Sequence, residues 1–158
     1  MRLVHMLMLV LVAALWGFNF VVIRLGLDNF PPLFFSALRF FFAAVPLVFF
    51  IPRPDVPWRT IIGIGLMLGV VKFSFLFIGM DVGMPPGLAS LLLQSQAFFT
   101  VLIAFLAFGA QPKPLQLAGM AVAFTGIALI ASSIDGDFTV TGLALVLAAA
   151  VAWACSNM

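Results

Sequence analysis

Six long apolar runs, separated by short breaks, constrain the fold of this chain more than any other feature. A helix needs about 20 consecutive apolar residues to cross a bilayer. The runs lack the period-two alternation of membrane-spanning strands, and helices are the other structure that satisfies its backbone in lipid. The sequence therefore predicts helices at residues 6–23, 33–51, 61–80, 88–108, 115–131 and 142–158.

The composition excludes a water-soluble fold. Of the 158 residues, 65% are hydrophobic and 8% are charged, whereas a soluble domain carries about 25% charged residues. So few charges could not cover a water-facing surface, so the lipid bilayer is the expected partner of the apolar surface. The net charge of +2 is too small and too scattered to suggest a nucleic-acid partner.

The breaks between the runs carry turn and helix-start signals. They lie at residues 31–32, 52–57, 85–87, 112–114 and 135–137. Because each break is short, consecutive helices are expected to be antiparallel and to form one compact domain. We predict an all-α membrane protein, a polytopic bundle of five transmembrane helices plus the start of a sixth. Residues 1–137 would form the five-helix unit, and residues 138–158 would begin a second unit.

A cleaved signal peptide is the alternative for the first run, because Arg2 and His5 give it a weakly positive start. The run is longer than a usual signal core, however, and Trp16, Gly17 and Asn19 interrupt it. A membrane-spanning helix is therefore the preferred interpretation.

The loop charges predict the orientation, because cytoplasmic loops of membrane proteins carry an excess of Lys and Arg. With a cytoplasmic N-terminus, the inner side holds Arg2, Arg53, Arg59 and Lys113, opposed by Asp55 alone. The outer side would then hold Arg24 together with Asp28, Asp81, Asp135 and Asp137. This asymmetry favours an N-terminus inside the cell.

The first and sixth runs resemble one another around a tryptophan. Trp16 and Trp153 lie 137 positions apart, since 153 minus 16 is 137, and each follows small or apolar residues and precedes a polar residue. Chance similarity is the alternative. Five helices separate the two starts, and an odd number is what an inverted repeat requires. Because the chain stops inside its sixth run, we expect it to be the first repeat of an inverted-repeat transporter whose second repeat is missing.

Polar residues inside the runs are the candidates for function. Lys72 lies near the middle of the third run, where an exposed ammonium costs at least about 2.5–3.5 kcal/mol. It is expected to face a wet cavity and attract an anionic substrate group, with a structural lysine paired to carbonyls as the alternative. Arg39 lies two turns into the second run; it either extends to the outer interface or has a functional role.

The fourth run carries two polar pairs at helical spacing. Ser90 and Gln94 lie four residues apart, as do Gln96 and Thr100, and the two pairs face directions about 200° apart. One pair could line a cavity while the other bonds a neighbouring helix, and both could be structural. The predicted lining of a substrate cavity is Trp16, Asn19, Lys72, Ser90, Gln94 and Gln96.

Small residues spaced four apart predict close helix contacts. Gly65 and Gly69 in the third run, and Gly119 and Ala123 in the fifth, place small side chains on one helix face. Such faces allow two helix backbones to approach closely in a membrane. A chance occurrence in a chain rich in Gly and Ala is the alternative.

The residues that nucleotide hydrolysis, metal binding or nucleophilic catalysis would need are missing from the sequence. The chain contains no Gly-rich phosphate loop, and its one His and one Cys, His5 and Cys155, lie in distant segments and are not expected to form a metal cluster. A Ser-His-acid arrangement is not expected either, because His5 lies at the extreme N-terminus. A membrane-embedded enzyme would need clustered groups of this kind. We therefore expect no enzymatic activity, no cofactor and no bound metal.

Specific strings give the chain a family resemblance. They are WGFNFVVI at 16–23, LRF at 38–40, GMPPGLASLLLQSQAFFT at 83–100, QLAG at 116–119 and WACSN at 153–157. With these strings the chain resembles the front half of EamA-type transporters of the drug/metabolite transporter superfamily. It looks most similar to the bacterial O-acetylserine/cysteine exporters. Two departures are Ala110, where similar proteins carry Glu, and Lys72, where they carry an uncharged polar residue.

The resemblance implies ten helices in two inverted five-helix repeats around a central cavity. It also implies export of amino acids and related small polar metabolites across the bacterial inner membrane by alternating access. The alternatives are a half-size transporter that works with a second subunit as a dimer, and a membrane scaffold that transports nothing.

Overall fold

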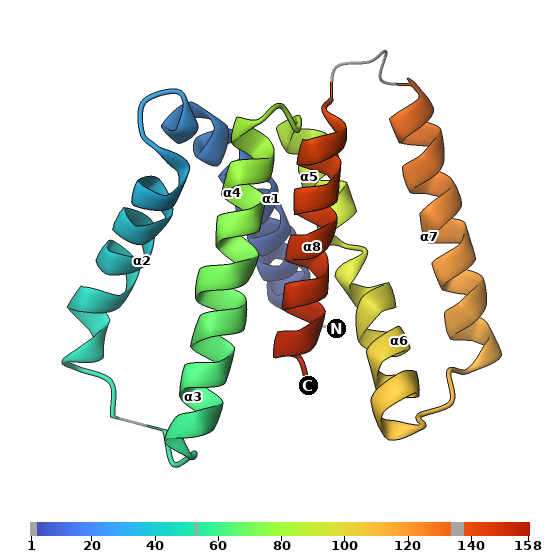
Figure 1. The fold of residues 1–158 in the computed structure, drawn as a ribbon. Helices are drawn as coiled ribbons and strands as arrows, with labels where there is room; N and C mark the ends of the chain where they lie inside the picture. The colour runs from blue at the N-terminus through green and yellow to red at the C-terminus, as the bar shows by residue number, and fades with distance from the viewer. Residues whose placement is uncertain (1–2, 53, 134–137) are drawn as a thin grey trace.

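The computed structural model describes residues 3–52, 54–133 and 138–158, and its elements are helices throughout these ranges (Figure 1). They are α1 (Leu3–Leu27), α2 (Pro32–Val48), α3 (Trp58–Ile64), the π-helix η1 (Gly65–Lys72), α4 (Phe73–Asp81), α5 (Pro86–Leu93), α6 (Gln96–Phe108), α7 (Pro114–Ser133) and α8 (Val140–Ser156). The elements α3, η1 and α4 run on from one another as a single rod, and α5 and α6 together cover the fourth apolar run. The predicted all-helical fold is confirmed.

Three of these helical segments are long and apolar enough to cross a membrane over their described residues: Leu3–Leu27, Trp58–Asp81 and Pro86–Phe108. Three further apolar helices, Pro32–Val48, Pro114–Leu129 and Val140–Ser156, are shorter. The observed helices match the six predicted runs, with differences of a few residues at their ends. The chain is therefore a polytopic helical membrane protein.

Prolines and one threonine fix where helices begin. Pro32, Pro86 and Pro114 each occupy the first helical position, where their missing N–H group is no loss. Thr139 precedes α8, and its hydroxyl accepts a hydrogen bond from the Gly142 amide at 3.0 Å. The same hydroxyl donates to the Val82 carbonyl at 2.8 Å, which ties the start of α8 to the turn after α4.

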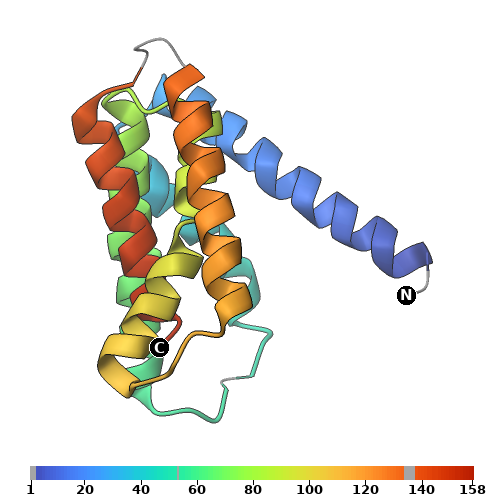
Figure 2. The same cartoon turned by 90° about the vertical axis from the view of Figure 1, so that its right-hand side faces the viewer.

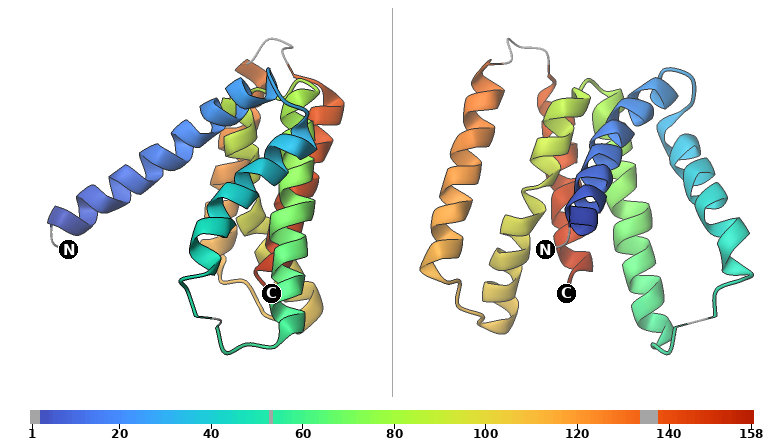
Figure 3. Two further views of the ribbon diagram at one scale, coloured as in Figure 1. Left: turned by 90° about the vertical axis from the view of Figure 1, so that its left-hand side faces the viewer. Right: turned by 180° about the vertical axis from the view of Figure 1, so that it is seen from behind.

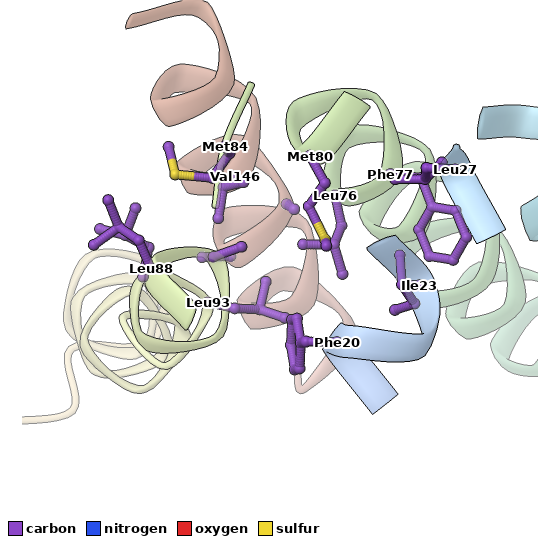
Figure 4. Packing of buried hydrophobic residues seen from close by; sticks show 14 residues of the cluster. Phe20, Ile23, Leu27, Leu76, Phe77, Met80, Met84, Leu88, Leu93 and Val146 are labelled. Carbon is purple, nitrogen blue, oxygen red and sulfur yellow. The ribbon is translucent and has the colours of Figure 1, made fainter. Parts of the chain in front are cut away.

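The hydrophobic core lies where α8 packs against the rod and against α5 and α6 (Figure 1). Figure 4 shows side chains from four segments meeting there. They are Phe20, Ile23 and Leu27 from the end of α1, Leu76, Phe77 and Met80 from α4, Leu88 and Leu93 from α5, and Val146 from α8, joined by Met84. The core lies toward the end of α1, the end of α4 and the start of α5. The predicted orientation places these helix ends on the outer side of the membrane.

Two glycines allow the closest backbone approach in the described core. A Cβ atom added to Gly142 would lie 2.9 Å from the Gly79 carbonyl oxygen, and one added to Gly79 would lie 3.2 Å from the Gly142 carbonyl oxygen. The contact between α4 and α8 therefore requires glycine at Gly142 and leaves little room at Gly79.

The predicted small-residue faces do not make such contacts. A Cβ atom added to Gly65, Gly69 or Gly119 would meet no neighbouring atom of the described residues within 4 Å. Gly65 and Gly69 instead border a groove of about 670 Å³ between α2 and the rod, and Gly119 and Ala123 border one of about 320 Å³ beside α7. The prediction of close helix contacts at these positions is wrong, because spacing alone does not say which face a neighbouring helix covers.

The helix α1 leaves the bundle at a slant, so that its N-terminal end lies away from the other helices (Figures 2 and 3). Its first part is exposed, with 60% or more of Leu7, Leu9 and Val12 accessible. Only its last part is buried, at Phe20, Ile23 and Leu27. An apolar helix face of this size is suited to lipid or to further helices.

Some predictions concern residues outside the described ranges. Arg2, Arg53, Asp135 and Asp137, which helped to set the orientation, are among them, and so is the proposed unit boundary at residue 137. The cytoplasmic N-terminus and the division at 137 therefore stay predictions.

Candidate substrate site

A pocket of about 230 Å³ lies between α1, α5 and α8. Its polar and aromatic lining consists of Trp16 from α1, Ser90 and Gln94 from the fourth run, and Trp153 from α8, together with Phe20. The remaining lining is aliphatic or glycine. Small-molecule sites commonly have this character, an apolar wall with a few convergent polar groups.

The two tryptophans that aligned in sequence meet in space. The ring centroids of Trp16 and Trp153 lie 5.7 Å apart, with the ring planes tilted by 54°. This spacing falls within the range of favourable aromatic pairs. The sequence around Trp153 indicates only a repeat, so the predicted cavity lining does not include this residue. The match to Trp16 was the signal that could have found it.

The fourth run is interrupted where it borders the pocket. The amides of Gln94 and Ser95 each donate at 3.0 Å to the carbonyl oxygens of Leu91 and Leu92, three residues back, so the last turn of α5 tightens. The Ser95 hydroxyl also donates to the Leu92 carbonyl at 2.6 Å, and α6 begins at the next residue. Interrupted membrane helices are a common setting for transporter binding sites.

Ser90 lies one turn before Gln94 on the pocket side. Its hydroxyl donates a hydrogen bond to the Gly87 carbonyl at 2.7 Å, which leaves the lone pairs of the hydroxyl oxygen available as acceptors. The exposed Gln94 amide can both donate and accept. Together they offer the pocket hydrogen-bonding groups without a net charge.

Lys72 is the last residue of η1 and is 5% exposed. Its ammonium nitrogen lies 3.7 Å from the ring centroid of Phe73 and 4.4 Å from that of Trp153. Lys72 is thus not part of the pocket lining, but it contacts the ring of Trp153, a residue that does line the pocket. A π-helical segment ends at Lys72, and such segments occur frequently at functional sites.

The other two predicted residues lie apart from the pocket lining. The side-chain carbonyl of Gln96 accepts a hydrogen bond from the Asn157 amide at 2.9 Å and one from Thr100 at 3.4 Å, so it joins α6 to the end of α8. Asn19 is partly buried on α1, one turn beyond Trp16. The structure therefore brings Trp16, Ser90 and Gln94 together, adds Trp153, and leaves Lys72 next to this group.

Arg39 lies in α2 and, like Lys72, has its cationic group next to the Phe73 ring. Its guanidinium carbon is 5.1 Å from the Phe73 ring centroid, and its Nη1 atom is buried without a hydrogen-bond partner in the described part of the chain. That nitrogen does not reach water, which argues against an arginine whose whole head group extends to the interface.

The comparisons with known proteins agree with the fold. No solved structure matches the chain. The chain is 47% identical over 150 residues to a "Probable amino-acid metabolite efflux pump" of Escherichia coli, covering 94% of this chain and 50% of that protein. It is 34% identical to a "Probable terminal-alkyne amino-acid exporter" of Streptantibioticus cattleyicolor, covering 90% and 50%.

A third relative, the "Uncharacterized inner membrane transporter YedA" of Escherichia coli, is 27% identical over 91% of this chain and 49% of its own length. The chain therefore spans about half the length of these relatives. The model of the EamA-like transporter family matches residues 3–132. With its helices and this match taken together, the chain belongs to the EamA-like transporter family.

Proposed function

We propose that this chain forms half of a secondary transporter that exports amino acids or related small metabolites by alternating access. The observation that carries the proposal is the pocket of Trp16, Ser90, Gln94 and Trp153 at an interrupted helix. The Escherichia coli and Streptantibioticus relatives, named for amino-acid metabolite efflux and amino-acid export, support the same substrate class.

The pocket chemistry suits a small zwitterion. Its volume of about 230 Å³ would hold several water molecules, which occupy about 30 Å³ each in the liquid. The Trp16 and Trp153 rings can attract a substrate ammonium group, and Ser90 and Gln94 can hydrogen-bond to polar atoms. Lys72, whose ammonium group contacts the Trp153 ring, would supply the positive charge for a carboxylate. O-acetylserine and cysteine are among the candidates, as the resemblance suggests.

A second set of helices would complete the transport path. We propose that it comes from a second five-helix repeat, as in relatives of about twice this length, or from a second subunit. The exposed apolar part of α1 is consistent with either source.

Export from whole cells tests the proposal. The protein is produced from its complete reading frame, which we expect to continue for about 130–140 residues beyond Met158 as a second repeat. Cells that overproduce it should release more cysteine and O-acetylserine into the medium than cells with an empty vector, because efflux scales with the number of carriers. Gln94→Leu should lower the release by about tenfold, since one hydrogen-bonding group of the pocket is lost.

Gln111→Leu is the matched control, because Gln111 is exposed in the loop between α6 and α7. A stop codon directly after Met158 would exclude a second repeat in the same chain and would favour the half-size transporter that works as a dimer. Overproduction without added release of any amino acid would contradict the transporter and leave the scaffold alternative.

We also propose that the protein lies in the bacterial inner membrane with a cytoplasmic N-terminus. The name of the YedA relative supports the membrane, and the loop charges support the orientation. Single cysteines at Arg53→Cys and Gly136→Cys, in a Cys155→Ala background, are tested with a membrane-impermeant thiol reagent on whole cells. Labelling is expected at position 136 and not at position 53. The opposite pattern would reverse the orientation.

A further inference from the structure

Two cationic side chains from different helices meet on one aromatic ring. The Arg39 guanidinium carbon lies 5.1 Å, and the Lys72 ammonium nitrogen 3.7 Å, from the centroid of the Phe73 ring. Because the two distances share an end point, their sum limits the separation of the cations to about 9 Å, and like charges at this range repel strongly in an apolar medium.

Both cations lie within the apolar part of the bundle. The start of α2 and the end of α4 are at the same end of the molecule (Figure 1). At a rise of about 1.5 Å per residue, Arg39 lies about 10 Å along α2 from Pro32, and Lys72 about 14 Å along the rod from Asp81. The hydrocarbon core of a bilayer is about 30 Å thick, so both charges are well inside it.

No acidic group of the described chain balances this pair. The three described aspartates, Asp28, Asp55 and Asp81, are all exposed. The ion pair formed among the described residues joins Arg24 to Asp28 at 3.5 Å and involves neither cation. The Phe73 ring attracts both charges but cancels neither, and a buried Arg39 nitrogen keeps an unused hydrogen-bond donor.

We infer that Arg39 and Lys72 form a two-cation site for the anionic end of the substrate, and that the preferred substrate is an amino acid with a second carboxylate. The inference rests on the proposed export function and narrows its substrate class. A neutral amino acid brings one carboxylate and one ammonium group, so bound here it would leave the two cations unbalanced. A second carboxylate supplies the missing negative charge in a low dielectric.

The geometry fits a carboxylate held by both side chains. One oxygen bound by two nitrogens holds them at most about 6 Å apart, twice a hydrogen bond of about 2.9 Å, and a carboxylate that gives one oxygen to each nitrogen allows a wider separation. Both separations lie within the upper limit of about 9 Å between the two cations. Trp153 links the site to the pocket, because its ring contacts Lys72 and lines the cavity.

Glutamate and glutamine test the inference, because they have nearly the same shape and differ by one charge. The purified protein, produced from its complete reading frame, is reconstituted into liposomes preloaded with radiolabelled L-glutamate or L-glutamine. Efflux above protein-free liposomes should be about tenfold faster for glutamate. Arg39→Gln should remove this preference by slowing glutamate alone, and Arg39→Lys should keep most of it. Arg59→Gln is the matched control, because Arg59 is exposed near the start of α3.

The outcomes separate the two proposals. Equal efflux of both amino acids, or faster efflux of glutamine, from the unmodified protein would overturn the two-cation site while supporting transport. The site is likewise overturned if well-folded Arg39→Gln protein keeps the glutamate preference. If neither amino acid, nor L-cysteine in a parallel arm, leaves the liposomes faster than without protein, both the site and the proposed function are contradicted. Because the unmodified protein decides the main comparison, an Arg39 variant that fails to fold does not prevent the test.

Discussion

Replacing Lys72 with glutamine is expected to reduce the export of zwitterionic and anionic substrates by about tenfold to a hundredfold. The reason is electrostatic. Lys72 is 5% exposed within a membrane helix, and a substrate carboxylate beside it gains a charged partner where water competes weakly. Neither Gln94 nor Asn19 can take over, because an amide carries no net charge. Release of cysteine and O-acetylserine into the medium, normalised to the amount of protein in the membrane, is the measurement.

Two further variants make this prediction specific. Lys72→Met should cause the same loss of export, because it keeps most of the length of the side chain and removes the charge. Lys113→Gln should export normally, since Lys113 is exposed in the loop before α7. Unchanged export by both Lys72 variants at normal protein levels would refute the substrate role. Lys72 would then be a structural residue held between the Phe73 and Trp153 rings.

Replacing Gly142 with leucine is expected to have the largest effect on stability. Its Cβ atom alone would approach the Gly79 carbonyl oxygen to 2.9 Å, and backbone atoms cannot move aside as a flexible side chain can. Overpacking of this kind costs about 1–3 kcal/mol or more. The melting temperature of the detergent-solubilised protein, followed by size-exclusion chromatography after heating, should fall by about 5–10 °C.

Gly119→Leu is the matched control for this experiment. It makes the same substitution inside a membrane helix, but its added Cβ atom would meet no neighbouring atom within 4 Å in the part of the chain that the structure describes. Gly119→Leu should therefore leave the melting temperature nearly unchanged. If the two variants have the same melting temperature, the contact between α4 and α8 is not the close approach that the structure indicates.

Much of the fold could be predicted from the sequence, because the membrane leaves few choices. Runs of about 20 apolar residues had to be helices, and prolines such as Pro32, Pro86 and Pro114 marked where three of them begin. The family followed from specific strings, above all the one at residues 83–100. These features act locally, so a single sequence reveals them.

What the sequence could not reveal depends on contacts between helices. The interruption at Gln94 and Ser95 contains neither proline nor glycine. The π-helix that ends at Lys72 has no residue pattern that distinguishes it from an α-helix. The site is similar: helical spacing put Ser90 and Gln94 on one face of the fourth run, but only the packing of α8 showed that Trp153 joins them. The glycines that permit close contact, Gly79 and Gly142, lie on two helices and share no local pattern.

The family match ends before α8, whereas the hydrophobic core includes residues of that helix. The family match ends at residue 132, yet Val146, Ala149 and Ala150, all beyond that point, are fully buried in the core. A fragment cut at the end of the match would expose the faces of Leu76 and Met80 that α8 now covers, and it would lose the anchor between Thr139 and Val82. We therefore expect a stable fragment of this protein to extend beyond residue 132 and to include α8.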